Sequence, residues 1–341
     1  MKDLSFFNKI IFFVNNVFAL LFVISFAIPY VSPRTLPILS VLSLAVPLLI
    51  GIHLVFMVYW MLSGFKRQFL LSLFCIFLAI AFSYFPYKFQ AKEVISGSSF
   101  SVMNYNVRIF NRYGWIKGKD VPKEIWDFIA KEDPDLLSMQ EYYPADGMRI
   151  KYPYKYEKLK GQNHTNGLAI FSKFPILGRG SLDFEDTANN AIYVDVLRNG
   201  DTIRVYNVHL ESSGIKPDSV EITGINEVES RKTVQRLLNS FTRQQPQVVR
   251  VLEHMNECRH KVILCGDFNN TSYSWAYRKL KGELKDSFLE AGKGFGRTYS
   301  FNSYPLRIDF ILADNRYQVN GHYNYSIGLS DHEPILARLG N

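Results

Sequence analysis

Residues that can bind a metal ion or move a proton stand at the ends of two apolar runs. Asp267 and Asn269 follow the run 262–265, while Asp331 and His332 stand just before another apolar run near the C-terminus. A buried strand gives the side chains at its end a rigid base, so active sites often occur at such positions. Carboxylate, amide and imidazole groups together predict metal-assisted attack on a phosphate ester.

Five further polar residues end other apolar runs and complete the groups that phosphodiester hydrolysis requires. They are Asn106, Glu141, Asn207, His209 and Asp309. A hard cation such as Mg²⁺ takes one or two protein carboxylates and keeps several waters, so Glu141 is the natural metal ligand. Mn²⁺ favours the same oxygen-rich sites, and the sequence does not distinguish the two metals.

The same residues offer groups for the attacking water and for the phosphoryl charge. Either His332 or Asp267 can orient or deprotonate a water molecule, and Asp309 can hold the imidazole of His332 in one tautomer. Neutral donors for the charge on the phosphoryl oxygens come from Asn106, Asn207, Asn269 and His209. Each residue alone has an ordinary explanation, because asparagine at a strand end is commonly a turn residue. Only the ordered set indicates chemistry.

Short runs rich in Val, Ile, Tyr and Phe predict the strands that carry these residues. The runs are 100–107, 136–139, 167–171, 191–196, 202–210, 261–265, 307–312 and 334–339. Helical patterns cover 121–131 and 228–239, and a third helix is expected at 248–258 because Pro246 resets the chain. More strands than helices, in mixed order, predict two packed sheets flanked by helices.

Three uncharged stretches precede the strands. Each reaches the ~20 apolar residues that cross a hydrocarbon core, and we expect transmembrane helices at about 10–31, 36–62 and 69–85. A signal peptide has a shorter apolar region and a small-residue cleavage site, which three successive runs with charged hinges do not match. The sequence therefore predicts a membrane anchor over 1–92, a linker over 93–99 and one soluble domain over 100–341.

The positive charge of the chain belongs mostly to its N-terminal part. Of the net charge of +8, residues 1–95 contribute +5 (seven basic minus two acidic residues), which leaves +3 for residues 96–341. Proteins that bind duplex DNA usually show a clear basic footprint, and this domain does not. The expected spans place Lys2, Lys9, Lys66 and Arg67 on one side of the membrane and Arg34, Lys88 and Lys92 on the other. This difference favours a cytoplasmic N-terminus and an extracytoplasmic catalytic domain.

The ordered motifs resemble those of the endonuclease/exonuclease/phosphatase superfamily, which has the deoxyribonuclease I-like fold. The matching segments are Asn-Tyr-Asn at 104–106, Gln-Glu at 140–141, Asn-Val-His at 207–209, Gly-Asp-Phe-Asn at 266–269, Arg-Ile-Asp at 307–309 and Ser-Asp-His at 330–332. The resemblance covers about residues 100–339. It implies a four-layer α/β sandwich, with two mixed β-sheets face to face and helices outside, here preceded by three transmembrane helices.

The resemblance also implies roles for the matching residues. The metal-binding group is Asn106, Glu141 and Asp331, with Mg²⁺ or Mn²⁺ as the cofactor. The catalytic group is His209, Asp267, Asn269, Asp309 and His332, and Asn207 is expected to bind substrate. Accounts of the superfamily differ on the general base, which is assigned here to His332. The segment 207–210 departs from the pattern of the abasic-site enzymes.

These observations predict a membrane-anchored, Mg²⁺-dependent phosphohydrolase, in particular a phosphodiesterase acting on a phospholipid-type or nucleic-acid substrate. Tethering to a membrane raises the effective concentration of lipid substrate. An extracytoplasmic scavenging nuclease is the alternative within the same chemistry. A catalytically inactive, membrane-tethered binding module is the alternative outside it, since one fold hosts many functions. The sequence identifies no protein partner.

Overall fold

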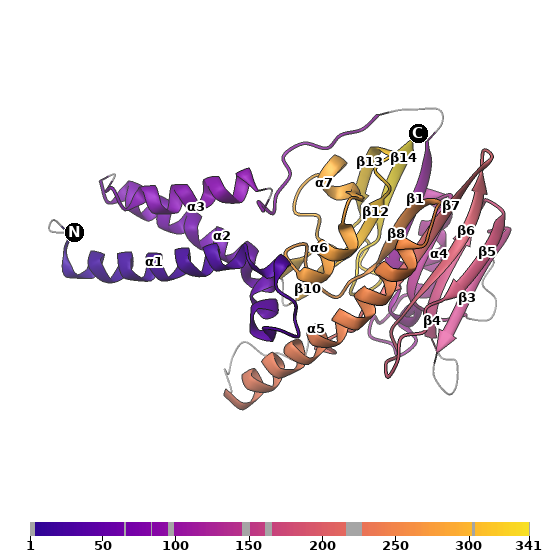
Figure 1. Ribbon diagram of the computed structural model, residues 1–341, viewed down its shortest axis with the longest axis horizontal. Coiled ribbons are helices and arrows are strands. Elements are labelled where there is room, and N and C mark those ends of the chain that lie inside the picture. The colour runs from indigo at the N-terminus through magenta and orange to yellow at the C-terminus, as the bar shows by residue number, and fades with distance from the viewer. Residues whose placement is uncertain are drawn as a thin grey trace.

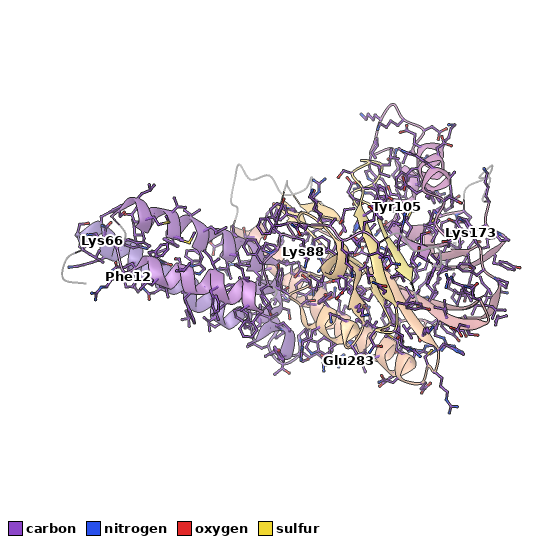
Figure 2. The ribbon with its side chains drawn as sticks, turned by 90° about the horizontal axis from the view of Figure 1, so that it is seen from above. Phe12, Lys66, Lys88, Tyr105, Lys173 and Glu283 are labelled. Atoms are coloured by element: carbon purple, nitrogen blue, oxygen red, sulfur yellow. The ribbon has the colours of Figure 1, made fainter. Side chains whose placement is uncertain are left out.

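The computed structural model describes residues 4–64, 66–82, 84–94, 99–144, 151–160, 166–215, 227–301 and 304–340. A bundle of three helices projects from an α/β domain, as Figure 1 shows. In the view from above, Lys66 lies at the far end of the bundle and Lys88 lies beside the domain (Figure 2). The bundle therefore has one free end and one end that meets the domain.

The bundle contains α1 (Phe6–Ser25), α2 (Pro37–Leu62) and α3 (Phe69–Ala81), with the short helix η1 (Ile28–Tyr30) between the first two. Two segments, Phe6–Tyr30 and Pro37–Leu62, are long and apolar enough to cross a membrane, with mean hydropathies of 2.4 and 2.5. Helices long and apolar enough for a span are therefore present at two of the three expected positions.

The expectation of a third span at 69–85 is wrong in length. The helix α3 has 13 residues, which rise about 20 Å, whereas a hydrocarbon core is about 30 Å thick. The chain leaves the helix after Ala81, and Tyr84 turns to the domain, where its ring lies 5.2 Å from that of Tyr273. Docking of these aromatic residues on the domain ends the helix early.

The bundle has a packed interior and an apolar exterior. Phe22, Val46 and Ala79, one from each helix, are completely buried. A buried polar chain also joins the helices, because Ser72 donates a hydrogen bond to Asn15 at 3.2 Å and pairs with His53 at 3.4 Å. Such buried polar pairs commonly hold helices together in membranes.

The first sheet of the domain has six strands in the order β13-β14-β1-β2-β4-β3. Their bounds are β1 Phe100–Asn106, β2 Leu136–Tyr142, β3 Tyr154–Lys160, β4 Asn166–Ser172, β13 Gln318–Asn324 and β14 Ile335–Gly340. The β1–β2 pair is parallel and the other pairs are antiparallel, so the sheet is mixed.

The second sheet also has six strands, in the order β5-β6-β7-β8-β12-β9. Their bounds are β5 Ile176–Ser181, β6 Asn190–Arg198, β7 Asp201–His209, β8 Lys261–Asp267, β9 Lys285–Asp286 and β12 Asp309–Ala313. The β7–β8 pair is parallel and the others are antiparallel. A separate hairpin contains β10 (Tyr299–Phe301) and β11 (Tyr304–Leu306).

The two sheets pack face to face with helices on their outer faces. Side chains alternate along a strand, so Val102 of β1 and Ile263 of β8 enter the core between the sheets, while Met103 and Leu264 face outward. The helix α4 (Val121–Glu132) covers the outer face of the first sheet, and α5 (Glu227–Asn256) with α6 (Trp275–Lys281) covers that of the second. Two mixed sheets between helices give the α/β sandwich that the sequence predicts.

All eight expected strands are present, but the expected break at Pro246 is wrong. The helix α5 runs without interruption from Glu227 to Asn256 and contains Pro246. Phe241, Val248 and Val251, on both sides of the proline, are buried beneath the helix. Burial of these residues, with Val248 and Val251 packed on the second sheet, outweighs the ~3 kcal/mol cost of proline within a helix. Two further short helices are η2 (Arg108–Asn111) and α7 (Ser287–Ala291).

Candidate active site

The strand β8 places Asp267 at the centre of the site. In the register of the sheet, Asp267 lies opposite His209 at the end of β7 and opposite Asp309 at the start of β12. Gly266 makes this close pairing possible, because a Cβ atom there would lie 2.0 Å from the carbonyl oxygen of Val208. The sheet thus brings three predicted catalytic residues together, with a glycine where the strands leave no space.

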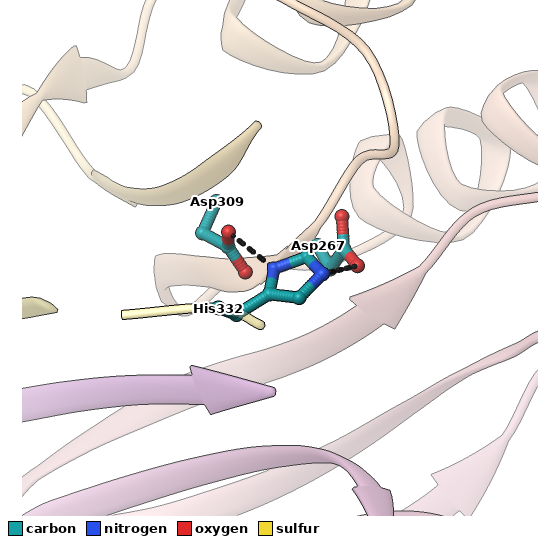
Figure 3. A group of neighbouring side chains, drawn as sticks. All are labelled: Asp267, Asp309 and His332. Atoms are coloured by element: carbon teal, nitrogen blue, oxygen red, sulfur yellow. Dashed lines mark hydrogen bonds and ion pairs between the residues drawn. The ribbon is translucent and has the colours of Figure 1, made fainter. Parts of the chain in front are cut away.

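His332 lies between two buried carboxylates (Figure 3). Its Nδ1 donates a hydrogen bond to Oδ2 of Asp309 at 2.9 Å, and its Nε2 lies 3.6 Å from Oδ2 of Asp267. The potential ligand atoms of these three residues all lie within 4.8 Å of one another, close enough to hold a metal ion. Whether these three residues bind a metal ion depends on their protonation states.

The charges around His332 favour its protonated form. Burial alone would lower the pKa of His332, but the carboxylates of Asp309 and Asp267 outweigh it and raise the pKa well above the ordinary value. Burial raises the pKa of Asp267, although His332 opposes this shift. Because a histidine must be deprotonated to bind metal, this cluster is better suited to proton transfer and charge stabilisation.

One oxygen of Asp267 collects contacts from several predicted site residues. Besides His332, Nε2 of His209 lies 3.6 Å from Oδ2 of Asp267, and Nδ2 of Asn106 donates a hydrogen bond to it at 3.1 Å. Burial lowers the pKa of His209, against the attraction of Asp267. A neutral His209 therefore stands beside the carboxylate, opposite the charged His332.

Asn269 fixes the other oxygen of Asp267. The backbone N–H of Asn269 donates to Oδ1 of Asp267 at 2.8 Å, and its Nδ2 donates to the carbonyl oxygen of Leu210 at 3.0 Å. The residue has a φ of +48°, a left-handed conformation that asparagine adopts more readily than most residues. This conformation explains why an asparagine stands two residues after the aspartate.

An oxygen-rich group lies beside this cluster. Burial raises the pKa of Glu141, and the negative charge of Asp331 raises it further. Oδ1 of Asn106 accepts a hydrogen bond from the backbone N–H of Arg108 at 3.1 Å, while Nε of Arg108 lies 3.2 Å from Asp331. Two neighbouring carboxylates and an amide oxygen suit a hard divalent cation, which would relieve the repulsion that Glu141 experiences.

Asn207 lies apart from the cavity, within the structure. It is completely buried, its Oδ1 accepts from Gln140 at 2.6 Å, and its Nδ2 donates to the carbonyl oxygens of Met139 and Ala169 at 2.7 and 3.0 Å. These contacts join the second sheet to the first. The expected contact of Asn207 with substrate stays a prediction.

Two cavities meet at Glu141. The larger, of about 500 Å³, is lined by Glu141, Asp267, Asn269, Asp331 and His332. The smaller, of about 220 Å³, is lined by Glu141 and His209 together with Lys158, Lys160 and other residues. The predicted site therefore opens to both cavities.

Among the residues of the larger cavity that sequence reasoning missed, Arg108 and Tyr299 contact predicted site residues. Arg108 pairs with Asp331, and the ring of Tyr299 lies 4.9 Å from that of His332. Arg108 follows the Asn106 motif by two positions, a signal that could have identified it. Tyr299 reaches the site from the β10–β11 hairpin, which no sequence motif marks.

Comparison with known proteins agrees with the fold and the motifs. The Endonuclease/Exonuclease/phosphatase family profile matches residues 103–332, and a domain of unknown function matches residues 8–85. No curated protein sequence matches the chain.

Several solved structures have the same fold as the C-terminal domain. D. rerio TDP2, solved with a single-strand DNA product, is 18% identical with a TM-score of 0.53, covering 72% of this chain and 100% of that one. The human Nocturnin catalytic domain is 16% identical with a TM-score of 0.52, covering 72% and 94%. A family protein from Bacteroides thetaiotaomicron is 21% identical with a TM-score of 0.50, covering 72% and 98%. At these identities the likeness shows the fold alone. The family profile matches more than half of the chain's residues, so the chain belongs to the endonuclease/exonuclease/phosphatase family.

Proposed function

We propose that this protein is a membrane-anchored, divalent-metal-dependent hydrolase of phosphate esters, acting on a phosphodiester. The observation that carries the proposal is the convergence of His209, His332 and Asn106 on one oxygen of Asp267. This cluster lines a cavity beside the carboxylates of Glu141 and Asp331. A proton-transfer group next to an oxygen-rich cation site is the arrangement that water attack on a phosphate requires.

Glu141, Asp331 and Asn106 would hold the cation, which we propose is Mg²⁺ or Mn²⁺. When bound, such a cation neutralises charge on the phosphoryl oxygens and orients the substrate. The remaining steps belong to side chains of this chain. Asp267 accepts a proton from the attacking water, because burial makes its carboxylate more basic than an exposed one. The water oxygen bonds to phosphorus as the ester P–O bond breaks, and the protonated His332 returns a proton to the leaving oxygen.

The histidines stabilise charge on the phosphate. His332 donates from Nε2 while Asp309 holds its Nδ1, so the ring has one fixed orientation. We assign the base to Asp267 rather than to His332, because the two carboxylates keep His332 protonated. The neutral His209 and the amide of Asn269 supply further donors at the same edge of the sheet.

The membrane anchor consists of α1 and α2, with α3 packed against them. Much of the bundle's surface is apolar and exposed, with exposed fractions of 80% at Phe6, 68% at Phe13 and 69% at Val55. Soluble proteins rarely expose contiguous apolar surface on this scale.

Lys66 lies at the end of the bundle away from the domain, and Arg67 follows it in the sequence. The chain returns to the domain along α3 and the non-helical residues 84–87, which together replace the single long helix expected from the sequence. Basic residues at the far end favour an extracytoplasmic domain. A protease added to intact cells should digest the domain if the domain is extracytoplasmic. Survival of the domain under these conditions would contradict the proposed orientation.

A nucleic-acid phosphodiester is the second candidate. TDP2, which shares the fold, was solved with a single-strand DNA product. Hydrolysis of a nucleic-acid phosphodiester bond requires the same chemistry as hydrolysis of a phospholipid one. A test must therefore offer both substrate classes, and it must also detect the catalytically inactive module that the fold alone permits.

Full-length protein in detergent, with Mg²⁺, should release product from a panel of phosphodiesters that includes a small aryl diester, diacyl phospholipids, sphingomyelin and single-stranded DNA. Asp267→Asn and His332→Gln should each abolish the release, as should a chelator. The matched controls Asp127→Asn and His260→Gln change exposed residues and should leave it intact. A folded protein that cleaves no ester with Mg²⁺ or Mn²⁺ would identify a binding module instead.

A further inference from the structure

The larger cavity at the active site is apolar away from the catalytic cluster. Leu44, Leu237, Phe241 and Leu306 line it, although they come from three separate elements: α2, α5 and β11. Its catalytic end contains Asp267 and other charged residues. The cavity thus joins an apolar wall to a polar reaction centre.

The membrane anchor supplies part of this wall. Leu44 belongs to α2, and the hydroxyl of Tyr304 donates a hydrogen bond to its carbonyl oxygen at 3.2 Å. The neighbouring Ser43 is buried and meets the domain at two atoms. Its Oγ, which donates to the carbonyl oxygen of Ser40 at 2.6 Å, lies 3.2 Å from Oδ1 of Asn270, and its own carbonyl oxygen accepts from the hydroxyl of Thr271 at 3.1 Å. These bonds fix α2 against the loop that begins at Asp267. The anchor is therefore docked at the site rather than only tethered to it.

The length of α2 places this contact at a membrane boundary. The charged residues Lys66 and Arg67 follow Leu62, so the far boundary lies at that end of the helix. With a rise of ~1.5 Å per residue, the segment 43–62 alone spans ~30 Å, the thickness of a hydrocarbon core. Leu44 then lies where acyl chains meet headgroups, at the depth of a lipid phosphate.

Exposed aromatic residues surround the same region. Tyr113 and Trp115, which are 66% and 37% exposed, line the cavity, and Tyr30 near the end of α1 is 67% exposed. Tyrosine and tryptophan are enriched at the boundary between membrane and water. Their position supports contact of the cavity's mouth with the membrane surface.

The smaller cavity offers the opposite chemistry. Lys158, Lys160, Asn166 and Asn189 line it, and Glu141 is common to both cavities. A phosphate held at Glu141 would have an apolar wall on one side and a polar pocket on the other, in which Lys158 pairs with Asp183 and Lys160 donates to backbone carbonyls. Those surroundings match an ester whose two substituents are an acyl-bearing group and a polar headgroup.

The larger cavity has few groups for a nucleic-acid strand. Among its described lining residues Arg108 is the one lysine or arginine, and it is paired with Asp331 at 3.2 Å. A strand brings further phosphates on both sides of the cleaved bond, and proteins that bind one line its path with cations. The charge of this cavity favours an ester with a single phosphate.

We infer that the substrate is a membrane phospholipid diester and that α2 is part of its binding site, with the acyl chain along the wall formed by Leu44, Leu237, Phe241 and Leu306. This inference rests on the proposed function and adds the substrate class. The lipid stays in the membrane while its phosphate reaches Asp267, and the headgroup enters the smaller cavity.

The test uses the full chain in lipid vesicles with Mg²⁺ and the methyl, octyl and hexadecyl esters of p-nitrophenyl phosphate, which share one reacting group. The catalytic efficiency should rise at least about a hundredfold from methyl to hexadecyl ester, because each buried methylene contributes about 0.8 kcal/mol. Efficiency that does not depend on chain length, or faster cleavage of single-stranded DNA, would overturn the inference while the proposed function stands. If no ester is cleaved, the proposed function fails as well.

Substitutions in the apolar wall distinguish it from the membrane's own effect on substrate concentration. Leu44→Gln and Leu237→Gln should lower the ratio of the efficiencies for the hexadecyl and methyl esters about tenfold, the change that ~1.4 kcal/mol produces. Leu48→Gln and Val234→Gln are matched controls on the same helices, at exposed positions outside the cavity lining. Equal effects of the test and control pairs would refute a chain-binding wall.

A photoactivatable phosphatidylcholine provides a readout that needs no turnover. In vesicles it should label α5 at 233–241, where Leu237 and Phe241 line the cavity, and not at 248–256, where Val248 and Val251 pack on the second sheet. Labelling absent from 233–241, or equal along both segments, would show that lipid does not enter the cavity.

Discussion

The Nδ1 nitrogen of His332 donates a hydrogen bond of 2.9 Å to the buried carboxylate of Asp309, 23 positions earlier in the chain. This bond leaves Nε2 facing Asp267 and fixes the ring between two negative charges. An asparagine at 309 removes one of the two negative charges that keep the ring protonated, and its amide can donate to Nδ1 of the neutral ring. Asp309→Asn should therefore lower kcat about a thousandfold with little change in Tm, by analogy with triads in which an aspartate orients a histidine.

The matched control for this substitution is Asp314→Asn, which lies just after β12 and pairs with the exposed Arg316. Its kcat for a small aryl phosphodiester should equal that of the parent. A loss below about threefold for Asp309→Asn would mean that His332 does not depend on Asp309 for catalysis.

Removal of the cation should abolish activity through the group around Glu141. A chelator should stop hydrolysis and Mg²⁺ should restore it. Glu141→Gln should raise the Mg²⁺ concentration for half-maximal rate by at least about tenfold, a loss found even for groups that only support a ligand. Glu290→Gln, an exposed change in α7, is the control. An unchanged Mg²⁺ dependence would place the cation elsewhere, with Asp267, Asp309 and His332 as the next candidates.

Gly266→Ala tests whether strand spacing sets the site. The added methyl group would lie 2.0 Å from the backbone of Val208 in β7, so the strands must separate. Overpacked cores lose about 1–3 kcal/mol, and we expect a lower Tm together with reduced kcat, because β7 ends in His209. Gly51→Ala has nothing within 4 Å of the new atom and should change neither. A variant with the parent's Tm and kcat would show that the sheet adapts at no cost.

The central strands of both sheets could be predicted from the sequence, and the edge strands could not. The strands β3, β5 and β13 lie at sheet edges, where they carry lysines or glycines instead of apolar runs. Charged and glycine-bearing edges protect a sheet from further pairing, and this composition removes the pattern that identifies a strand. The site could be predicted because its residues end central strands such as β7 and β8, whose apolar runs are unmistakable.

The contact between the anchor and the site could not be predicted. Ser43 and Thr271 are 228 positions apart, and neither residue carries a motif. The bond follows from the way η1 and α2 pack on α5 and α6, a property of the tertiary structure alone. The end of α3 could not be predicted either, because Phe82 and Phe85 continue the apolar run in the sequence, whereas Tyr84 contacts Tyr273 of the domain in the structure.

A buried ion pair should make Arg307 one of the residues most important for stability. Its Nη1 lies 2.7 Å from Asp286, whose side chain is 1% exposed, and the guanidinium stacks over Phe310. Arg307→Met would leave a buried carboxylate without its partner, and we expect a loss of about 3–5 kcal/mol in unfolding free energy. Arg316→Met breaks an exposed pair with Asp314 and should cost about 0–1 kcal/mol. Urea denaturation measures the unfolding free energy of both variants. Equal losses in the two would contradict the expected difference between the buried and the exposed ion pair.

The stability of the domain should fall as the pH drops from about 6.5 to about 4, because of His322. Burial lowers the pKa of His322 to about 4, against the attraction of Asp286. Its ring pairs with Ser287 through Nδ1 at 2.9 Å and with Asn324 through Nε2 at 3.1 Å. Between these pH values the unfolded chain binds a proton at this histidine and the folded chain does not, so acid favours unfolding.

The shift corresponds to about 3 kcal/mol, fully present above pH 6.5 and lost toward pH 4. The urea midpoint measured at several pH values should decline over this range in the parent and in His260→Gln, which changes an exposed histidine. In His322→Gln the decline should be smaller, because glutamine keeps a polar group at the site and takes up no proton. Identical slopes for His322→Gln and the parent would mean that other groups govern the acid sensitivity.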